Sequence, residues 1–170
     1  MIRRAGPGDA AALGLAGVAA YAETYARLWD DPAAYLDQLA TFAEPAFAAQ
    51  LADECARVWL AEVRGRTVGF LTLAPGMADP VEAAAGGAEV GRLYLIAPCR
   101  GAGLGRRMVE AAAVEARAAG ARYLWLDAMR SERRAWEAYR RWGFRVIGEK
   151  LFERPVRADE RPMLVLRRDL

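Results

Sequence analysis

The sequence predicts a single domain of the α+β class, a mixed α/β sheet with helices packed against it. Its 170 residues suit one hydrophobic core, and contents of 55% apolar and 27% charged residues are ordinary for a folded domain. Two apolar, β-prone runs at 58–63 and 67–73 flank a short turn that contains Gly65, which is a hairpin pattern. Residues 89–128 then follow the order strand, helix, strand inside a mostly antiparallel chain, which gives a mixed sheet.

The first third of the chain is predicted to be helical after a short strand at 2–4. A helix is expected from Asp9, whose carboxylate would cap its first turn, to about Tyr25. Two short helices are expected over 32–39 and 45–51, because each range begins with a proline, which the first turn of a helix tolerates.

The rest of the chain is predicted to alternate strands and helices. After a loop at 75–87, the expected elements are a strand at 89–96, a turn at 97–103, a helix at 104–119, a strand at 123–128, a helix at 131–142 capped by Ser131, and strands at 144–152 and 163–167. The loop is rich in glycine and alanine, so we expect it to be mobile and to contribute little to the core.

Composition excludes several classes of function. The chain has no histidine, which removes Ser-His-Asp and Cys-His catalysis and every metal site that contains histidine. Cys55 and Cys99 form no C-x-x-C pair, so we predict no metal site and no disulfide framework. We find no signal peptide or membrane-spanning segment and therefore expect a cytoplasmic protein without a membrane partner. A net charge of only +2 argues against a nucleic-acid partner.

Charge is divided unevenly along the chain. Residues 1–56 carry eight acidic side chains and three arginines, whereas the remainder has an excess of positive charge. This polarity would suit a cationic group held by the first third and a polyanion held by the rest. Solvated helix faces that simply differ in charge would give the same pattern.

The segment 100–107, RGAGLGRR, is a glycine-rich turn between a predicted strand and a predicted helix. Its glycines allow a close approach to a ligand, and the first N–H groups of a helix attract an anion. The turn lacks the G-x-x-x-x-G-K-S/T of a Walker loop, and Arg106 stands where a dinucleotide-binding turn needs its third glycine. A structural turn without a ligand remains the alternative.

The string R-G-x-G-L-G at 100–105, after the strand GRLYLI, resembles the GNAT acetyltransferase family, as does A-x-x-x-Y-x-x-x-G-F from Ala135 to Phe144. The resemblance covers about 57–151. It implies a mostly antiparallel twisted sheet of six to seven strands, acetyl-CoA as co-substrate, and one domain over 1–170. Within that domain, 1–56 would form a helical substrate side, 57–151 the acetyl-CoA core and 152–170 the closing strand.

The resemblance also assigns residues to acetyl-CoA. Backbone groups of the glycine-rich turn would hold the pyrophosphate, and two leucines of the preceding strand would pair with the pantetheine arm. These residues are Leu93, Leu95, Arg100, Gly101, Ala102, Gly103, Leu104, Gly105 and Arg106. The sequence departs from the family pattern at Glu132, where an asparagine is common, so a cofactor contact there is doubtful.

Acetyl transfer to an amine needs a base, a donor for the thioester carbonyl and an acid for the leaving thiolate. The resemblance makes Tyr139 the acid, although its packing against Ala135 and Trp142 would also explain a helix tyrosine. We predict Glu89 as the base, because strand alternation would place it on the same face as Leu93. The alternative is an exposed glutamate at a strand end. The donor to the thioester carbonyl is expected to be the N–H of Leu93 or of a neighbouring residue.

The acceptor is expected to be a small cationic amine. The segment 21–29 and the later motifs loosely resemble a bacterial subgroup that includes polyamine acetyltransferases, which gives Glu23 and Tyr25 as substrate contacts. A packing stripe of Tyr21, Tyr25, Leu28 and Trp29 is the alternative. Two other functions stay open. One is a protein N-terminal or lysine acetyltransferase, which an aromatic-lined groove between the first helices and the loop at 76–87 would favour, and the other is an acyl-CoA sensor. A homodimer is expected from the resemblance alone.

Overall fold

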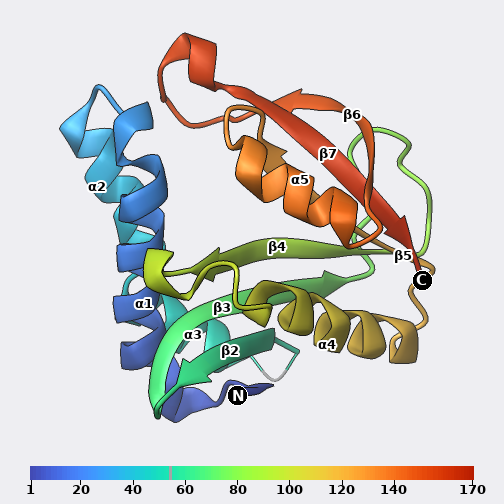
Figure 1. The fold of residues 1–170 in the computed structure, drawn as a ribbon, viewed down its shortest axis with the longest axis horizontal. Coiled ribbons are helices and arrows are strands. Elements are labelled where there is room, and N and C mark those ends of the chain that lie inside the picture. Colours follow the sequence, from blue (N-terminus) through green and yellow to red (C-terminus); the bar gives the residue numbers. More distant parts are fainter. Residues whose placement is uncertain (54) are drawn as a thin grey trace.

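The computed structural model describes residues 1–53 and 55–170 and contains a seven-stranded sheet flanked by helices (Figure 1). The strand order is β1-β2-β3-β4-β5-β7-β6, and every neighbouring pair is antiparallel except β4 and β5. The strands are β1 (Ile2–Arg4), β2 (Arg57–Val63), β3 (Arg66–Pro75), β4 (Gly87–Leu95), β5 (Tyr123–Met129), β6 (Arg145–Leu151) and β7 (Pro162–Asp169). The predicted fold class and mostly antiparallel sheet are confirmed.

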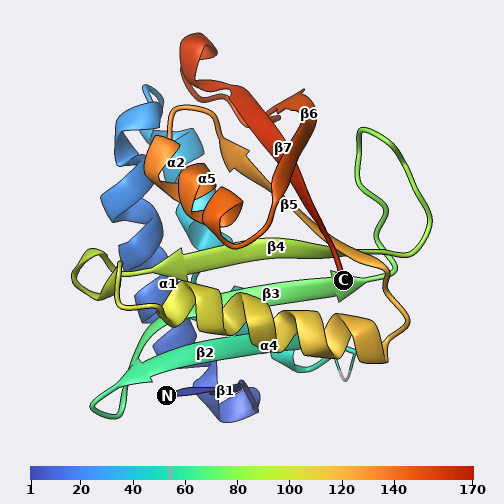
Figure 2. The ribbon, with the colours of Figure 1, turned by 45° about the vertical axis from the view of Figure 1, so that its right-hand side comes forward.

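Helices cover both faces of this sheet (Figure 2). They are α1 (Ala10–Tyr25), α2 (Pro32–Ala40), α3 (Glu44–Leu51), α4 (Leu104–Ala118) and α5 (Arg133–Arg141). Alternate residues of a strand point to opposite faces, so Trp59 packs in the core under α4 while Leu60 packs in the core under α1 and α3. No helix in the described part of the chain is long and apolar enough to cross a membrane.

The two predicted helix caps are wrong. The Asp9 carboxylate accepts the N–H of Gly6 at 2.8 Å and pairs with Arg3 at 2.7 Å, so it turns away from α1 and leaves that helix without a side-chain cap. Helix α5 begins at Arg133, and no side chain caps it at Ser131 or at Glu132. Asp9 pairs with Arg3 instead of α1, and α5 begins two residues after Ser131, so neither side chain has the geometry that a cap requires.

The loop at 76–86 is anchored to the sheet, contrary to the expectation of a mobile segment. Asp79 is only 1% exposed, and its carboxylate accepts the N–H groups of Val81 at 3.0 Å and Glu82 at 2.7 Å. The indole N–H of Trp125 on β5 donates to the carbonyl of Met77 at 2.8 Å. The aspartate turn and this aromatic donor give the loop fixed contacts that its glycine and alanine content concealed.

Two irregularities of β4 open the centre of the sheet. The register with β3 shifts between the pairs Thr72–Arg92 and Leu73–Val90, so Gly91 is a bulge residue that has no partner. Strand β4 pairs with β5 only over residues 87–89, after which the two strands diverge (Figure 2). The later half of β4 therefore presents an unpaired edge toward β5.

Candidate active site

A cavity of about 640 Å³ lies where β4 and β5 diverge. One part, the turn half, is lined by Leu93, Leu95, Gly101, Gly103, Gly105, Arg106 and Trp142. The other part, the aromatic half, is lined by Tyr21, Tyr25, Phe42, Arg92, Tyr94, Asp127 and Phe152. Tyr139 also lines this continuous cavity, so groups bound in the two halves would share one space.

The open edge of β4 has the polarity that an extended ligand needs. The N–H of Ile96 donates to Val68 on β3 at 3.0 Å, and alternation along the strand directs Tyr94 toward β3 as well. The backbone groups of Leu93 and Leu95 therefore point to the opposite edge, toward the cavity. This is the placement predicted for pairing with a pantetheine arm, except that the Leu95 carbonyl already accepts Arg100 Nε at 2.8 Å.

The glycine-rich turn offers free donors at the start of α4. In the described part of the chain, the N–H groups of residues 101–106 donate no backbone hydrogen bond, and the first helical bond joins Arg107 to Gly103 at 3.1 Å. Gly101 and Gly103 have φ values of 85° and 78°, which favour glycine, and a Cβ at either position would meet nothing within 4 Å. The turn is thus an open set of donors that fits a pyrophosphate.

Arg100 differs from the other residues of the turn. Its N–H donates to Ala97 at 3.2 Å and is not free for a phosphate. Its guanidinium donates to the Leu95 carbonyl and, at 2.8 Å, to Thr24 Oγ1 on α1. The expectation of a backbone contact from Arg100 is therefore wrong, and this residue instead ties β4 and the turn to α1.

Close packing against Trp142 explains why residue 105 is a glycine. A Cβ at Gly105 would come within 3.0 Å of the Trp142 ring, which lines the same half of the cavity. Leu104 is buried and begins α4, with Ala102 exposed beside it in the turn. The side chains of the turn thus set its packing, while its N–H groups face the space where an anion would lie.

Tyr139 lies on α5, lines the cavity and packs edge-on against Trp142, with ring centroids 5.4 Å apart. Burial raises the pKa of its phenol well above the usual range, and the negative charge of Asp127 raises it further. The phenol is therefore protonated at every working pH and is able to donate. The ring is packed while the residue lines the cavity, so the packing alternative does not exclude the predicted donor function.

Glu89 lies on the opposite face of β4 from the one predicted. Because Gly91 is a bulge, alternation breaks there, and Val90 and Leu93 share the α4 face while Glu89 faces the other way. Glu89 does not line the cavity, but its carboxylate lies beside Gly91, a residue of the cavity wall, because a Cβ built there would be 3.9 Å from Glu89 Oε1. Burial, followed by the charge of Asp127, raises the pKa of Glu89, and Lys150 opposes that shift.

Asp127 is a site residue that the sequence analysis missed. It stands on β5, lines the cavity and forms an ion pair with Lys150 Nζ at 2.5 Å. The pairing of β5 with β7 and of β7 with β6 brings these two residues together, although they are 23 positions apart. The only sequence signal was an acidic residue inside an otherwise apolar strand, YLWLDA.

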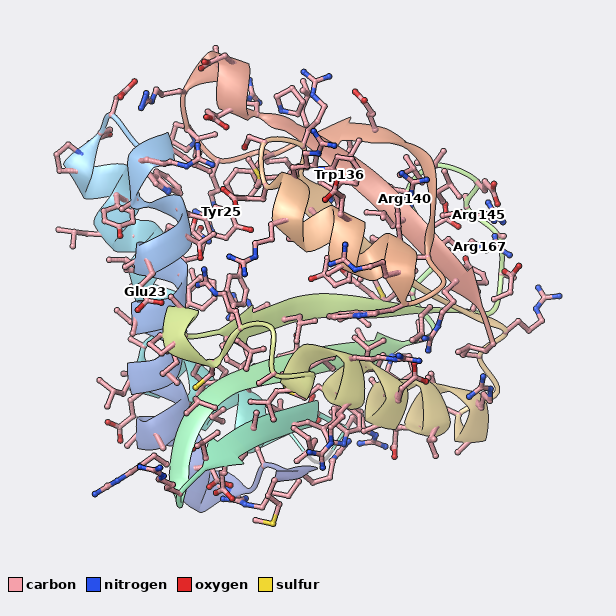
Figure 3. The ribbon with its side chains drawn as sticks, viewed as in Figure 1. Glu23, Tyr25, Trp136, Arg140, Arg145 and Arg167 are labelled. Atoms are coloured by element: carbon pink, nitrogen blue, oxygen red, sulfur yellow. The ribbon has the colours of Figure 1, made fainter. Side chains whose placement is uncertain are left out.

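The two predicted substrate contacts have different surroundings, although both lie near the end of α1 (Figure 3). Tyr25 lines the cavity and contacts the ring of Tyr94 edge-on, with centroids 6.2 Å apart. Glu23 does not line it, and its carboxylate accepts the N–H of Ala97 at 2.7 Å. We therefore assign Glu23 to holding the segment that leads into the glycine-rich turn.

The aromatic half is a connected set of rings. Tyr21 contacts Phe42 with centroids 4.7 Å apart, and Phe42 contacts Tyr94 with centroids 5.1 Å apart. Burial raises the pKa of Tyr21 to about 12 and that of Tyr94 further, so both phenols are neutral. Tyr21 and Tyr25 thus belong to a packed stripe that is at the same time a cavity wall.

Glu132 points into a bridge of charges and not toward the turn. Its carboxylate forms an ion pair with Arg27, which also binds Glu160 at 2.7 Å. Arg27 follows α1, Glu132 precedes α5 and Glu160 precedes β7, so the bridge joins three segments beside the cavity. The doubt about a cofactor contact at Glu132 is consistent with this engagement.

Solved structures of other proteins share the fold of this chain. The solved structures that resemble the chain include the N-acetyltransferase PaiA of Thermoplasma acidophilum in complex with coenzyme A, with 15% identity, a TM-score of 0.76 and coverage of 100% of this chain and 98% of that chain. They also include a ribosomal-protein-alanine N-acetyltransferase of Brucella melitensis, with 22% identity, a TM-score of 0.68 and coverage of 100% and 99%. These identities support the fold and not the substrate. No curated protein matches significantly.

The model of the acetyltransferase (GNAT) family matches residues 19–144, which is well over half of the chain. The match spans the divergence of β4 and β5, the glycine-rich turn and Tyr139, the features from which the cavity is built. The chain therefore belongs to the GNAT family and is an acetyl-CoA-dependent N-acetyltransferase.

Proposed function

We propose that the protein transfers the acetyl group of acetyl-CoA directly to a primary amine of a small acceptor held in the aromatic half of the cavity. The observation that carries this proposal is the continuity of the cavity from the free N–H groups of the glycine-rich turn, past Tyr139, to the aromatic half. A thioester lying along the open edge of β4 would meet an amine that enters from the other side. Direct attack then needs no covalent enzyme intermediate.

Tyr139 in the cavity wall and Glu89 beside that wall would account for the protons that the reaction releases and consumes. The C–N bond forms as the C–S bond breaks, and a protonated amine loses two protons on becoming an amide. One proton passes to the carboxylate of Glu89 and then to solvent. The phenol of Tyr139 supplies a proton to the leaving thiolate, and the second proton of the amine restores the phenol. The N–H of Leu93, at the open edge, would stabilise negative charge on the carbonyl oxygen.

All three parts of the chain would contribute residues to the cavity of one domain. Residues 1–56 supply Tyr21, Tyr25 and Phe42 to the acceptor wall, and 57–151 supply the turn and the open edge of β4. The closing segment, 152–170, contributes Phe152 and Met163 to the cavity. The last segment is thus part of the acceptor wall as well as a strand of the sheet.

The acceptor classes named by the sequence receive unequal support. A polyamine would find Asp127 paired with Lys150, Glu132 paired with Arg27, and the cation Arg92 in the same cavity wall. A protein acceptor receives less support, because no described residue of the loop at 76–86 lines the cavity, and the loop instead packs on β5 and β7 at Trp125 and Arg167. A small acceptor with an apolar body fits the aromatic walls best.

A melting curve with and without acetyl-CoA, followed by an assay of CoA release with a panel of amines, tests the proposal. Acetyl-CoA at about 100 times its dissociation constant should stabilise the protein by about 2.7 kcal/mol. Release of CoA that requires an amine, with the acetylated product identified by mass, is the expected result. Stabilisation without turnover of any amine would contradict the proposed reaction and favour an acyl-CoA sensor.

A further inference from the structure

Arg92 is a cation in the wall of the aromatic half that lacks a carboxylate partner. It precedes Leu93 on β4, and its Nη1 donates to the carbonyl of Thr41 at 2.8 Å. Its guanidinium lies over the ring of Phe42, 4.5 Å from the centroid. Among the described residues, no carboxylate oxygen lies within 4.0 Å of its nitrogens.

This arrangement leaves Arg92 with unused donors. A guanidinium carries five N–H donors, and one hydrogen bond of Arg92 is accounted for by Thr41. Burial lowers the pKa of Arg92, yet an arginine remains charged in proteins, so the cavity wall holds a partly desolvated positive charge. A charge removed from water is costly unless an anion compensates it, and a guanidinium is the side chain best suited to a carboxylate.

Negatively charged side chains lie across the cavity from the guanidinium of Arg92. Asp127 lines the cavity from β5. Glu89 lies on the same face of β4 as Arg92, across the Gly91 bulge, and its carboxylate lies beside Gly91 in the cavity wall without lining the cavity itself. Glu89 and Asp127 carry two negative charges against the one positive charge of Lys150, so this end attracts an ammonium group. A ligand bound here would meet a cation at one end, carboxylates at the other and aromatic rings between them.

We infer that the acceptor is a zwitterionic amine, an apolar amino acid or a close analogue, whose anionic group binds Arg92 while its amino group faces Glu89 and Asp127. This inference rests on the proposed function. It also explains why the cavity does not suit a polyamine, because Arg92 would repel a second ammonium group. Aromatic side walls favour an apolar body on the amino acid.

Matched pairs of acceptors that differ only in the carboxylate test the inference. The pairs are L-phenylalanine with phenethylamine and L-leucine with 3-methylbutylamine, and spermidine is measured beside them. We expect kcat/KM for each amino acid to exceed that of its decarboxylated partner at least about tenfold, the size of one charge-assisted contact. A preference for the decarboxylated amines or for spermidine would overturn the inference and leave the proposed function intact.

The variant Arg92→Gln ties that preference to this residue. In Arg92→Gln the tenfold ratio should fall to about one through a higher KM for the amino acids, with the amines little changed, and Arg92→Lys should restore part of it. Arg145→Gln is the control, since Arg145 lies on β6, far from α1 (Figure 3), and contributes only a 3.9 Å pair with Glu82. An unchanged ratio in Arg92→Gln would overturn the inference.

A binding measurement distinguishes a failure of this inference from a failure of the proposed function. Melting curves in the presence of saturating CoA, with and without L-phenylalanine, should show added stabilisation in the wild type and none in Arg92→Gln. Acetyl-CoA should stabilise both proteins equally, which also verifies that the variant folds. If no amine of either kind is acetylated, the proposed function fails and this inference fails with it.

Discussion

At the scale of single residues, Tyr139 offers the most direct test of the mechanism. Tyr139→Phe keeps the ring that packs against Trp142 and Phe144 but removes the hydroxyl. Since general acid catalysis is worth about 100-fold or more, kcat should fall by about that factor, with little change in acetyl-CoA affinity or melting temperature. Steady-state kinetics and melting curves are the measurements. Unchanged turnover would remove Tyr139 from the mechanism.

Glu89 should set the acidic limb of the pH profile. A base must be ionised, and because burial and Asp127 raise the pKa of Glu89, kcat/KM should rise with pH through a midpoint above the usual glutamate value. Glu89→Gln should lower the rate and remove that limb. Asp37→Asn, on the exposed side of α2, is the control and should leave the profile unchanged. A limb that persists in Glu89→Gln would assign the base elsewhere.

The same raised pKa has a consequence for stability with a definite sign. A carboxyl group whose pKa is higher in the folded state binds its proton more tightly there, so it favours folding at low pH. This contribution is lost as pH rises through the folded-state pKa of Glu89. Glu89→Gln should therefore be at least as stable as the wild type at neutral pH, and urea unfolding at two pH values measures this. A less stable variant at neutral pH would contradict the assigned environment.

At the scale of elements, the glycine-rich turn can be tested against a matched turn elsewhere. Gly103 and Gly65 have φ values of 78° and 72°, and a Cβ at either would meet nothing within 4 Å. Alanine at each position should therefore cost the same backbone strain, about 1–2 kcal/mol. Only Gly103→Ala should weaken acetyl-CoA binding, because Gly65 belongs to the hairpin between β2 and β3. Calorimetric titration of both variants would detect the difference, and equal losses would contradict it.

The elements also show where sequence reasoning succeeded and where it could not. The glycine-rich turn and the helix of Tyr139 follow from local signals, namely the closely spaced glycines at 101, 103 and 105 and the helix stop at Gly143, although the cap expected at Ser131 does not form. The face of Glu89 did not follow, because a period of two was assumed through Gly91, and one bulge reverses every later side chain. A glycine inside a strand was the available warning.

Asp127 and Arg92 make contacts that could not be predicted from the sequence. Asp127 meets Lys150 through two strand pairings, and Arg92 reaches Thr41 across 51 positions of the chain. Such contacts depend on tertiary packing, which no local pattern records. The substrate side of the cavity was therefore less predictable than the turn half, whose motif is continuous in sequence.

At the scale of the whole molecule, Arg27 connects segments that are distant in sequence. It pairs with Glu132 and Glu160, and its own side chain is 46% exposed. Arg27→Gln should destabilise the protein by about 1 kcal/mol, a value kept small because solvent screens the pairs. Arg133→Gln, which breaks the exposed pair with Glu137 within α5, should cost less than Arg27→Gln. Urea unfolding at low and high salt checks both, and equal losses would contradict the bridge.

Because β4 and β5 pair over only three residues, the sheet consists of two blocks of strands joined by a short ladder. Strands β1 to β4 form one block and β5 to β7 the other, and only residues 87–89 of β4 pair across the junction. A ligand strand lying against Leu93 and Leu95 would fasten the blocks together, so amide hydrogen exchange should slow in both blocks when CoA binds. A co-substrate bound in this way would replace the hydrogen bonds that β4 and β5 do not make to each other, so we expect the enzyme to be most rigid when acetyl-CoA is bound.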